Sequence, residues 1–229
     1  MKKLLIPVAL MSALIITSCK KDSSSSGGGV VSYRLQPSSF SATLLGATKG
    51  NTISGASSVT WTSGSMIISE IDFEAEKENL EIEYESKQVV NVNLFDLSPV
   101  LGNISIPDGT YDEVELKLDI KKTDSGVAPL VLKGDYTDAN GVKTPIEFSF
   151  NENFEIEVEA ENVVITSADY IGMINLQLSK FLTNVTVSDL SQVTKLNGKI
   201  LINSTSNSAL FFKIKNNLNF VADCDFDKK

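Results

Sequence analysis

Strict alternation of apolar and charged residues is the feature that most constrains how this chain folds. In residues 154–161 every even position is apolar and every odd position is glutamate. Residues 80–85 and 113–121 alternate in the same way, which places Tyr84 among the expected core residues. A period of two puts one face of a strand in the core and the other in water. The pattern therefore predicts antiparallel strands that are covered on one face only.

Shorter alternating runs occupy residues 90–94, 130–133, 146–150, 174–178 and 199–202. Turn signals lie between strand segments, and in Asp138-Ala139-Asn140-Gly141 the Asn-Gly pair tolerates the positive φ of a tight hairpin. No proline- or glycine-rich linker interrupts residues 56–205, and 42% of the chain is apolar, enough for a packed core. We predict a mainly β fold, an antiparallel β-sandwich that forms a single domain over residues 33–229.

Helical patterns are scarce and lie toward the C-terminus. One or two short helices are expected within residues 179–195. Beyond them, apolar residues recur at spacings of four, four and three: Leu210, Ile214, Leu218 and Val221. With Asn207 or Ser208 as N-cap, this spacing predicts a C-terminal helix whose apolar stripe packs on the sandwich. Leu210, Phe212 and Ile214 also fit a strand, so the sequence leaves both alternatives open.

The first nineteen residues resemble a bacterial lipoprotein signal. A basic start, Met1 to Lys3, precedes an apolar run from Leu4 to Ile16, which is shorter than the 20 or so residues that span a bilayer. Ile16-Thr17-Ser18-Cys19 is similar to a lipobox. That resemblance implies cleavage between Ser18 and Cys19, removal of residues 1–18, and lipid attachment at Cys19. The alternative is an ordinary signal peptide with a cysteine nearby by chance.

Serine and glycine dominate residues 22–29. Since these residues bury little surface, we expect the lipidated cysteine to be followed by a flexible tether over residues 19–32. Lysine rather than aspartate follows Cys19, which resembles the sorting pattern for the outer membrane. The expected location is the outer membrane, with attachment through the lipid anchor and either the periplasmic or the cell-surface face.

Three short motifs resemble a recurring domain of uncharacterised bacterial lipoproteins. They are VNLFDL (residues 92–97), IPDGTY (106–111) and LVLKGDY (130–136). The family is the domain of unknown function 4382 type, and the resemblance covers residues 58–180. It implies a β-sandwich-like lipoprotein and brings no catalytic residues.

Histidine is absent from the chain. Its absence excludes serine–histidine and cysteine–histidine triads and histidine-containing zinc sites. The net charge of −9 argues against a phosphate-backbone binder, and no phosphate-binding glycine-rich loop is present. We expect a non-enzymatic protein with no cofactor and no nucleic-acid partner.

The glutamate runs and the hairpin tip are candidate sites with ordinary alternatives. Paired carboxylates catalyse glycoside hydrolysis, but regular alternation is equally typical of a solvated strand face. Asp138, Asn140 and Glu147 match three positions of a calcium loop that starts at Tyr136, where aspartate would be required. A plain hairpin turn explains the tip without a metal.

Trp61 and Tyr136 are candidates for a carbohydrate-binding platform if exposed, although a single tryptophan is more often part of the core. The leading hypothesis is a membrane-anchored, non-enzymatic binding or adhesin-like module of the cell envelope. The alternatives are a carbohydrate- or calcium-dependent binding module of an uptake system, or a carboxylate-based hydrolase. The ligand, a protein or glycan partner, the oligomeric state and the state of Cys224 stay open.

Overall fold

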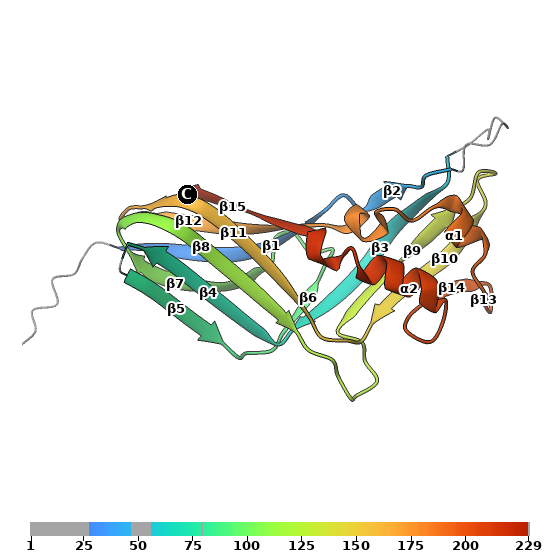
Figure 1. The fold of residues 1–229 in the computed structure, drawn as a ribbon, viewed down its shortest axis with the longest axis horizontal. Helices are drawn as coiled ribbons and strands as arrows, with labels where there is room; N and C mark the ends of the chain where they lie inside the picture. Colours follow the sequence, from blue (N-terminus) through green and yellow to red (C-terminus); the bar gives the residue numbers. More distant parts are fainter. Residues whose placement is uncertain (1–27, 47–55, 79, 229) are drawn as a thin grey trace, which may run out of the picture.

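A computed structural model describes residues 28–46, 56–78 and 80–228, and it confirms the mainly β prediction (Figure 1). The described strands form three sheets. The β1 sheet has the order β15 (Ala222–Lys228), β12 (Asp169–Gln177), β1 (Gly28–Ser38) and β7 (Val100–Pro107). The β8 sheet has the order β11 (Phe154–Ile165), β8 (Gly109–Ile120), β4 (Glu70–Lys77) and β5 (Leu80–Ser86).

The third sheet, called the β9 sheet, lies at the other end of the molecule (Figure 1). Its order is β13 (Lys195–Leu196), β14 (Lys199–Ile202), β10 (Lys143–Phe150), β9 (Leu130–Thr137), β3 (Ser58–Ile68) and β2 (Ser41–Thr43), with β6 (Val90–Asn93) also paired to β3. β3 and β4 are separated by Ser69 alone, so the chain passes almost directly from the β9 sheet into the β8 sheet. Buried side chains of all three sheets form one hydrophobic cluster.

β1 is a central strand of its sheet. It pairs in parallel with β12 and antiparallel with β7, and β10 and β14 are also parallel. The prediction of purely antiparallel sheets is therefore wrong. The predicted tether is wrong for residues 28–32, which belong to β1. Glycine fits here because a Cβ on Gly29 would lie 2.6 Å from the carbonyl oxygen of Ala168. Tight packing therefore explains a glycine that composition alone assigns to a flexible segment.

Short helices cover one face of the β9 sheet (Figure 1). They are η1 (Leu178–Leu182), α1 (Val187–Ser191) and α2 (Ser208–Lys215), whereas η2 (Leu218–Phe220) lies against β11. The Thr186 hydroxyl accepts a hydrogen bond from the Asp189 backbone N–H, while the Asp189 carboxylate accepts one from the Thr186 N–H, forming a capping box. In α2, the Phe211 ring lies 5.6 Å from that of Phe150, which ties the helix to the sheet.

The predicted apolar stripe of the C-terminal helix is confirmed, since all four of its residues are buried. The strand alternative for residues 210–214 is wrong. α2 nevertheless ends at Lys215, and the chain continues through η2 into β15, a strand that the sequence analysis did not predict. Within the described ranges, no helix has the length and apolar character needed to cross a membrane.

Candidate functional site: the acidic face of the β8 sheet

The four strands of the β8 sheet direct their charged residues away from the core. On β8, Leu116 and Leu118 are 1% and 0% exposed, so the intervening Lys117 projects from the opposite face. The predicted alternation in β11 is confirmed by the burial of Ile156 and Val158. The glutamates of this sheet therefore form the solvated face that the alternation favours.

Cross-strand pairing aligns these outward side chains in four rows. Two rows are entirely glutamate: Glu161, Glu113, Glu76 and Glu81, and next to them Glu159, Glu115, Glu74 and Glu83. The third row is Glu157, Lys117, Asp72 and Glu85, and the fourth is Glu155, Asp119 and Glu70. Fourteen of the 29 acidic residues of the chain lie in these rows, with one lysine among them. We call this surface the acidic face.

Neutralising contacts are concentrated at one end of the acidic face. Lys87 and Lys121 both form ion pairs with Glu70 in the fourth row, and Lys117 pairs with Glu115. Like charges directly opposite each other on a sheet are destabilising. The two all-glutamate rows therefore keep most of their mutual repulsion.

Burial and the charges of neighbouring carboxylates both raise pKa values on this face. Partial burial, followed by the charge of Glu115, raises the pKa of Glu74. Partial burial and neighbouring carboxylates also raise the pKa of Asp72. In contrast, a hydrogen bond from Lys121 lowers the pKa of Glu70 to about 2. Asp72 and Glu74 therefore hold their charge less readily than ordinary aspartate and glutamate.

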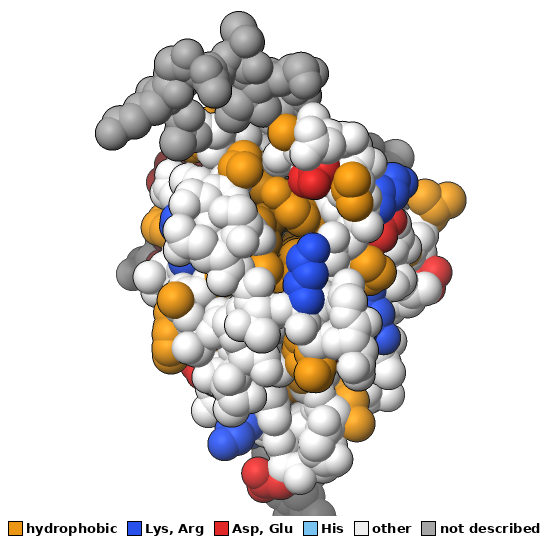
Figure 2. All heavy atoms as spheres, turned by 90° about the vertical axis from the view of Figure 1, so that its right-hand side faces the viewer, with side chains coloured by type: hydrophobic (Ala, Val, Ile, Leu, Met, Phe, Trp, Pro, Cys, Tyr) orange, Lys and Arg blue, Asp and Glu red, His pale blue; other side chains and the backbone are white. Residues whose placement is uncertain are grey.

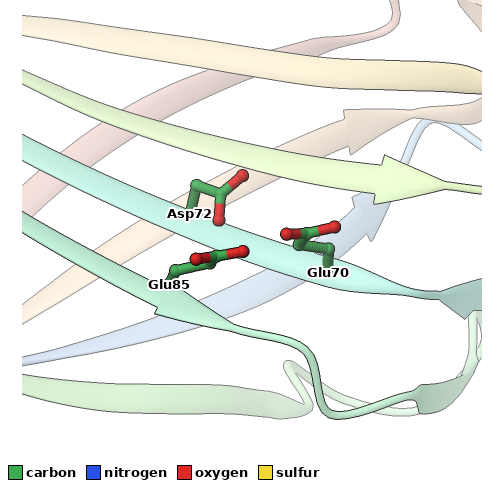
Figure 3. Close-up of side chains that lie close together, drawn as sticks. All are labelled: Glu70, Asp72 and Glu85. Atoms are coloured by element: carbon green, nitrogen blue, oxygen red, sulfur yellow. The ribbon is translucent and has the colours of Figure 1, made fainter.

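Three carboxylates converge where β4 and β5 lie side by side (Figure 3). Oxygen atoms of Glu70, Asp72 and Glu85 lie within 4.8 Å of one another, and the buried Oδ1 of Asp72 has no hydrogen-bond partner among the described residues. Two further triads with the same spacing occur on this face among the described residues: Glu74, Glu76 and Glu81, and Glu113, Glu115 and Glu159. A hollow of about 280 Å³ lies over the middle rows, lined in part by Asp72, Glu83 and Lys117. This geometry concentrates negative potential and attracts cationic groups.

Trp61 and Tyr136 do not form a binding platform, so that hypothesis is wrong. Their exposed fractions are 1% and 6%, and Tyr136 pairs with Val59, two residues before Trp61 on β3. The indole Nε1 of Trp61 donates a hydrogen bond of 3.1 Å to the Leu178 carbonyl oxygen. Trp61 is thus part of the core, with its polar atom satisfied by η1.

The hairpin residues do not come together as a calcium loop either. The Asp138 carboxylate accepts hydrogen bonds of 2.9 Å from the backbone N–H groups of Asn140 and Val142, which is the chemistry of a turn. Glu147 lies within β10 and forms an ion pair of 2.6 Å with Lys199. The plain hairpin alternative therefore explains the tip.

The predicted lipidation and cleavage residues, Cys19 and Ser18, lie outside the described residues. Cys224 on β15 is a free cysteine. Burial, followed by the charges of Asp225 and Asp223, raises the pKa of its thiol to about 12. The thiol stays protonated at neutral pH, which argues against a nucleophilic role.

The far end of the β9 sheet has a different surface. Figure 2 shows a few lysine and acidic side chains interspersed there with hydrophobic and uncharged polar ones. Comparison with known protein families, curated proteins and solved structures finds no match. The acidic face is therefore the feature of the molecule that points to a function.

The outward position of the glutamates is predictable from the sequence, but their alignment across four strands is not. Each glutamate run can be identified separately in the sequence. Their alignment depends on β4, β5, β8 and β11 becoming neighbours, which is a property of the fold. The available signal was the recurrence of acidic alternation in several segments, which indicates a shared face only once the strand order is known.

Proposed function

We propose that this protein is a lipid-anchored, non-enzymatic binding module of the outer membrane that uses its acidic face to bind a positively charged partner protein. The observation that supports the proposal is the pair of neighbouring all-glutamate rows, each of which crosses the four strands of the sheet. Such an arrangement opposes folding, because like charges face each other across each strand pair. A cationic partner would relieve the repulsion and would be attracted from a distance by the same field.

The proposed anchor depends on the Ile16-Thr17-Ser18-Cys19 motif. Two or more acyl chains give stable membrane attachment, whereas one chain binds marginally. Expressed in a Gram-negative host, Cys19→Ala should appear unprocessed or in the soluble fraction instead of the processed membrane fraction. Normal processing and membrane partitioning of this variant would contradict the lipobox.

A fluorescent decalysine peptide tests the cationic-partner proposal on the full chain in detergent. Its affinity should fall at least about tenfold between 50 and 500 mM NaCl, because the attraction is screened. The triple variant Glu74→Gln, Glu115→Gln, Glu159→Gln should weaken binding at low salt by about fivefold or more. A matched variant in the β9 sheet and its hairpin, Asp135→Asn, Asp138→Asn, Glu147→Gln, should change the affinity less than about twofold. Equal losses in the two variants would show that net charge alone attracts the peptide.

A further inference from the structure

One edge of the acidic face is a free strand. β5 is the terminal strand of its sheet and pairs with β4 only; within the described ranges no strand pairs with its other edge. At the opposite edge of the sheet, β11 lies against β15 and η2. An unpaired strand edge presents backbone N–H and C=O groups that can bind an added strand.

The inward face of β5 is also incompletely covered. Tyr84 and Leu80 lie on the core-facing side of the strand but are 40% and 46% exposed. Phe73, which pairs with Tyr84 on the neighbouring β4, is 2% exposed. The prediction that Tyr84 belongs to the core is therefore wrong, because its strand is at the edge and nothing described lies beyond it. An added strand would bring apolar side chains to this uncovered surface.

A second copy of this chain is a poor occupant of the edge. In an antiparallel pair of β5 strands, Glu81, Glu83 and Glu85 of one copy would face the same residues of the other. Like charges opposite each other disfavour such pairing, and natural edge strands use charge in this way to prevent self-association. The occupant must instead carry positive charge at the positions opposite these glutamates.

Resting on the proposed function, we propose that the free edge of β5 binds an extended segment of a partner protein in which basic and apolar residues alternate. The basic side chains lie opposite Glu81, Glu83 and Glu85. The apolar side chains cover the inward face at Leu80, Ile82 and Tyr84. The seven residues of β5 offer about 24 Å of edge for backbone hydrogen bonds.

Two labelled peptides of equal composition test this proposal on the full chain in detergent at 100 mM NaCl. Val-Lys-Ile-Lys-Val-Lys-Val has the required alternation, whereas Lys-Lys-Lys-Val-Ile-Val-Val lacks it. We expect the alternating peptide to bind at least about tenfold more tightly, because only alternation places charge and apolar groups on opposite faces. It should also slow hydrogen exchange of the β5 amides, which are unpaired with other strands on one side.

Matched charge variants separate edge binding from general attraction. Glu81→Gln, Glu83→Gln, Glu85→Gln should weaken the alternating peptide at least about tenfold, because the glutamates pair with its lysines. Glu157→Gln, Glu159→Gln, Glu161→Gln on β11 removes equal charge from the same face. It should cost less than about threefold, because β11 lies three strand spacings away, about 14 Å, beyond the Debye length.

Equal losses in the two triple variants, equal affinities of the two peptides, or unchanged exchange of the β5 amides would overturn strand addition. In those cases decalysine binding to the acidic face would still support the proposed function. Failure of both lysine peptides and of decalysine to bind would refute the proposed function together with this inference.

Discussion

The outer face of the β8 sheet and the β9 half of the molecule differ in what lies opposite their acidic residues. In the β9 half, Glu147 lies opposite Lys133 and forms an ion pair with Lys199, and Lys213 pairs with Asp189 at 2.5 Å. In the β8 sheet, glutamate faces glutamate in two complete rows. Among the described residues, only one of the eight glutamates in these two rows, Glu115, has a lysine partner. The acidic face is therefore a local property of the β8 sheet and does not follow from the net charge of the chain.

The largest effect should come from placing a charge beneath the acidic face. Ile156 is 3% exposed, so Ile156→Glu buries an unpaired carboxylate and should lower the free energy of unfolding by about 3–5 kcal/mol. Its neighbour Glu157 is exposed, and Glu157→Gln should change the free energy of unfolding by less than about 0.5 kcal/mol. Urea denaturation of both variants checks the assignment, and similar losses would mean that the two faces of β11 are misassigned.

The pH dependence of stability should sharpen the contrast between the halves. Raised pKa values at Asp72, Glu74, Glu113 and Glu155 mean that the folded state binds protons more readily than the unfolded state. Their contribution to stability is fully present below the unfolded pKa values, near 4, and is lost as pH rises through the higher folded values. The melting temperature at low salt should therefore be higher at pH 5 than at pH 7.5.

Two groups act in the opposite direction but outside this pH window. The lowered pKa values of Glu70, about 2, and of Asp189 give stability that is lost only as pH falls below about 4. A melting temperature that rises steadily from pH 5 to pH 7.5 would contradict the repulsion assigned to the acidic face. Adding salt at pH 7.5 should shrink the difference, because it screens like charges.

One substitution type should have opposite signs in the two halves. Glu74→Gln removes a charge that faces Glu115 and Glu83, and should stabilise the protein by about 0.3–1 kcal/mol. Glu147→Gln removes the ion pair with Lys199, and should destabilise it by about 0.2–1 kcal/mol. Thermal unfolding of the two variants measures both changes in stability. Changes of the same sign would contradict the difference in charge pairing between the two halves.

The residues show how far sequence reasoning reaches in this protein. A period of two is a local property, so it predicts that Ile156 is buried and that its neighbours are solvated. Burial of Trp61 depends on η1, a distant segment. Exposure of Tyr84 depends on β5 having no outer neighbour among the described strands. The rows of the acidic face require both strand order and register. None of these relations is encoded in the spacing of a single segment.

The smallest effect is expected at the hairpin tip. The Asp138 carboxylate is occupied by two backbone N–H groups, so 1 mM calcium should raise the melting temperature by no more than about 1 °C through this loop. A site with a dissociation constant of about 10 μM would instead add about 2.7 kcal/mol, or roughly 5–11 °C. A large rise that disappears in Asp138→Ala would restore the calcium loop. A rise that persists in this variant would point to the carboxylate triads of the acidic face.

The central position of β1 has a mechanical consequence. β1 begins at the end of the molecule opposite α1 (Figure 1), and it is joined to β12 on one side and to β7 on the other. Tension applied through the N-terminal end of β1 would run along the strand and load both hydrogen-bonded ladders in shear. Sheared ladders share the force among many bonds, whereas peeled ladders break one bond at a time. A pull from the proposed membrane anchor along β1 would thus be resisted by both ladders at once.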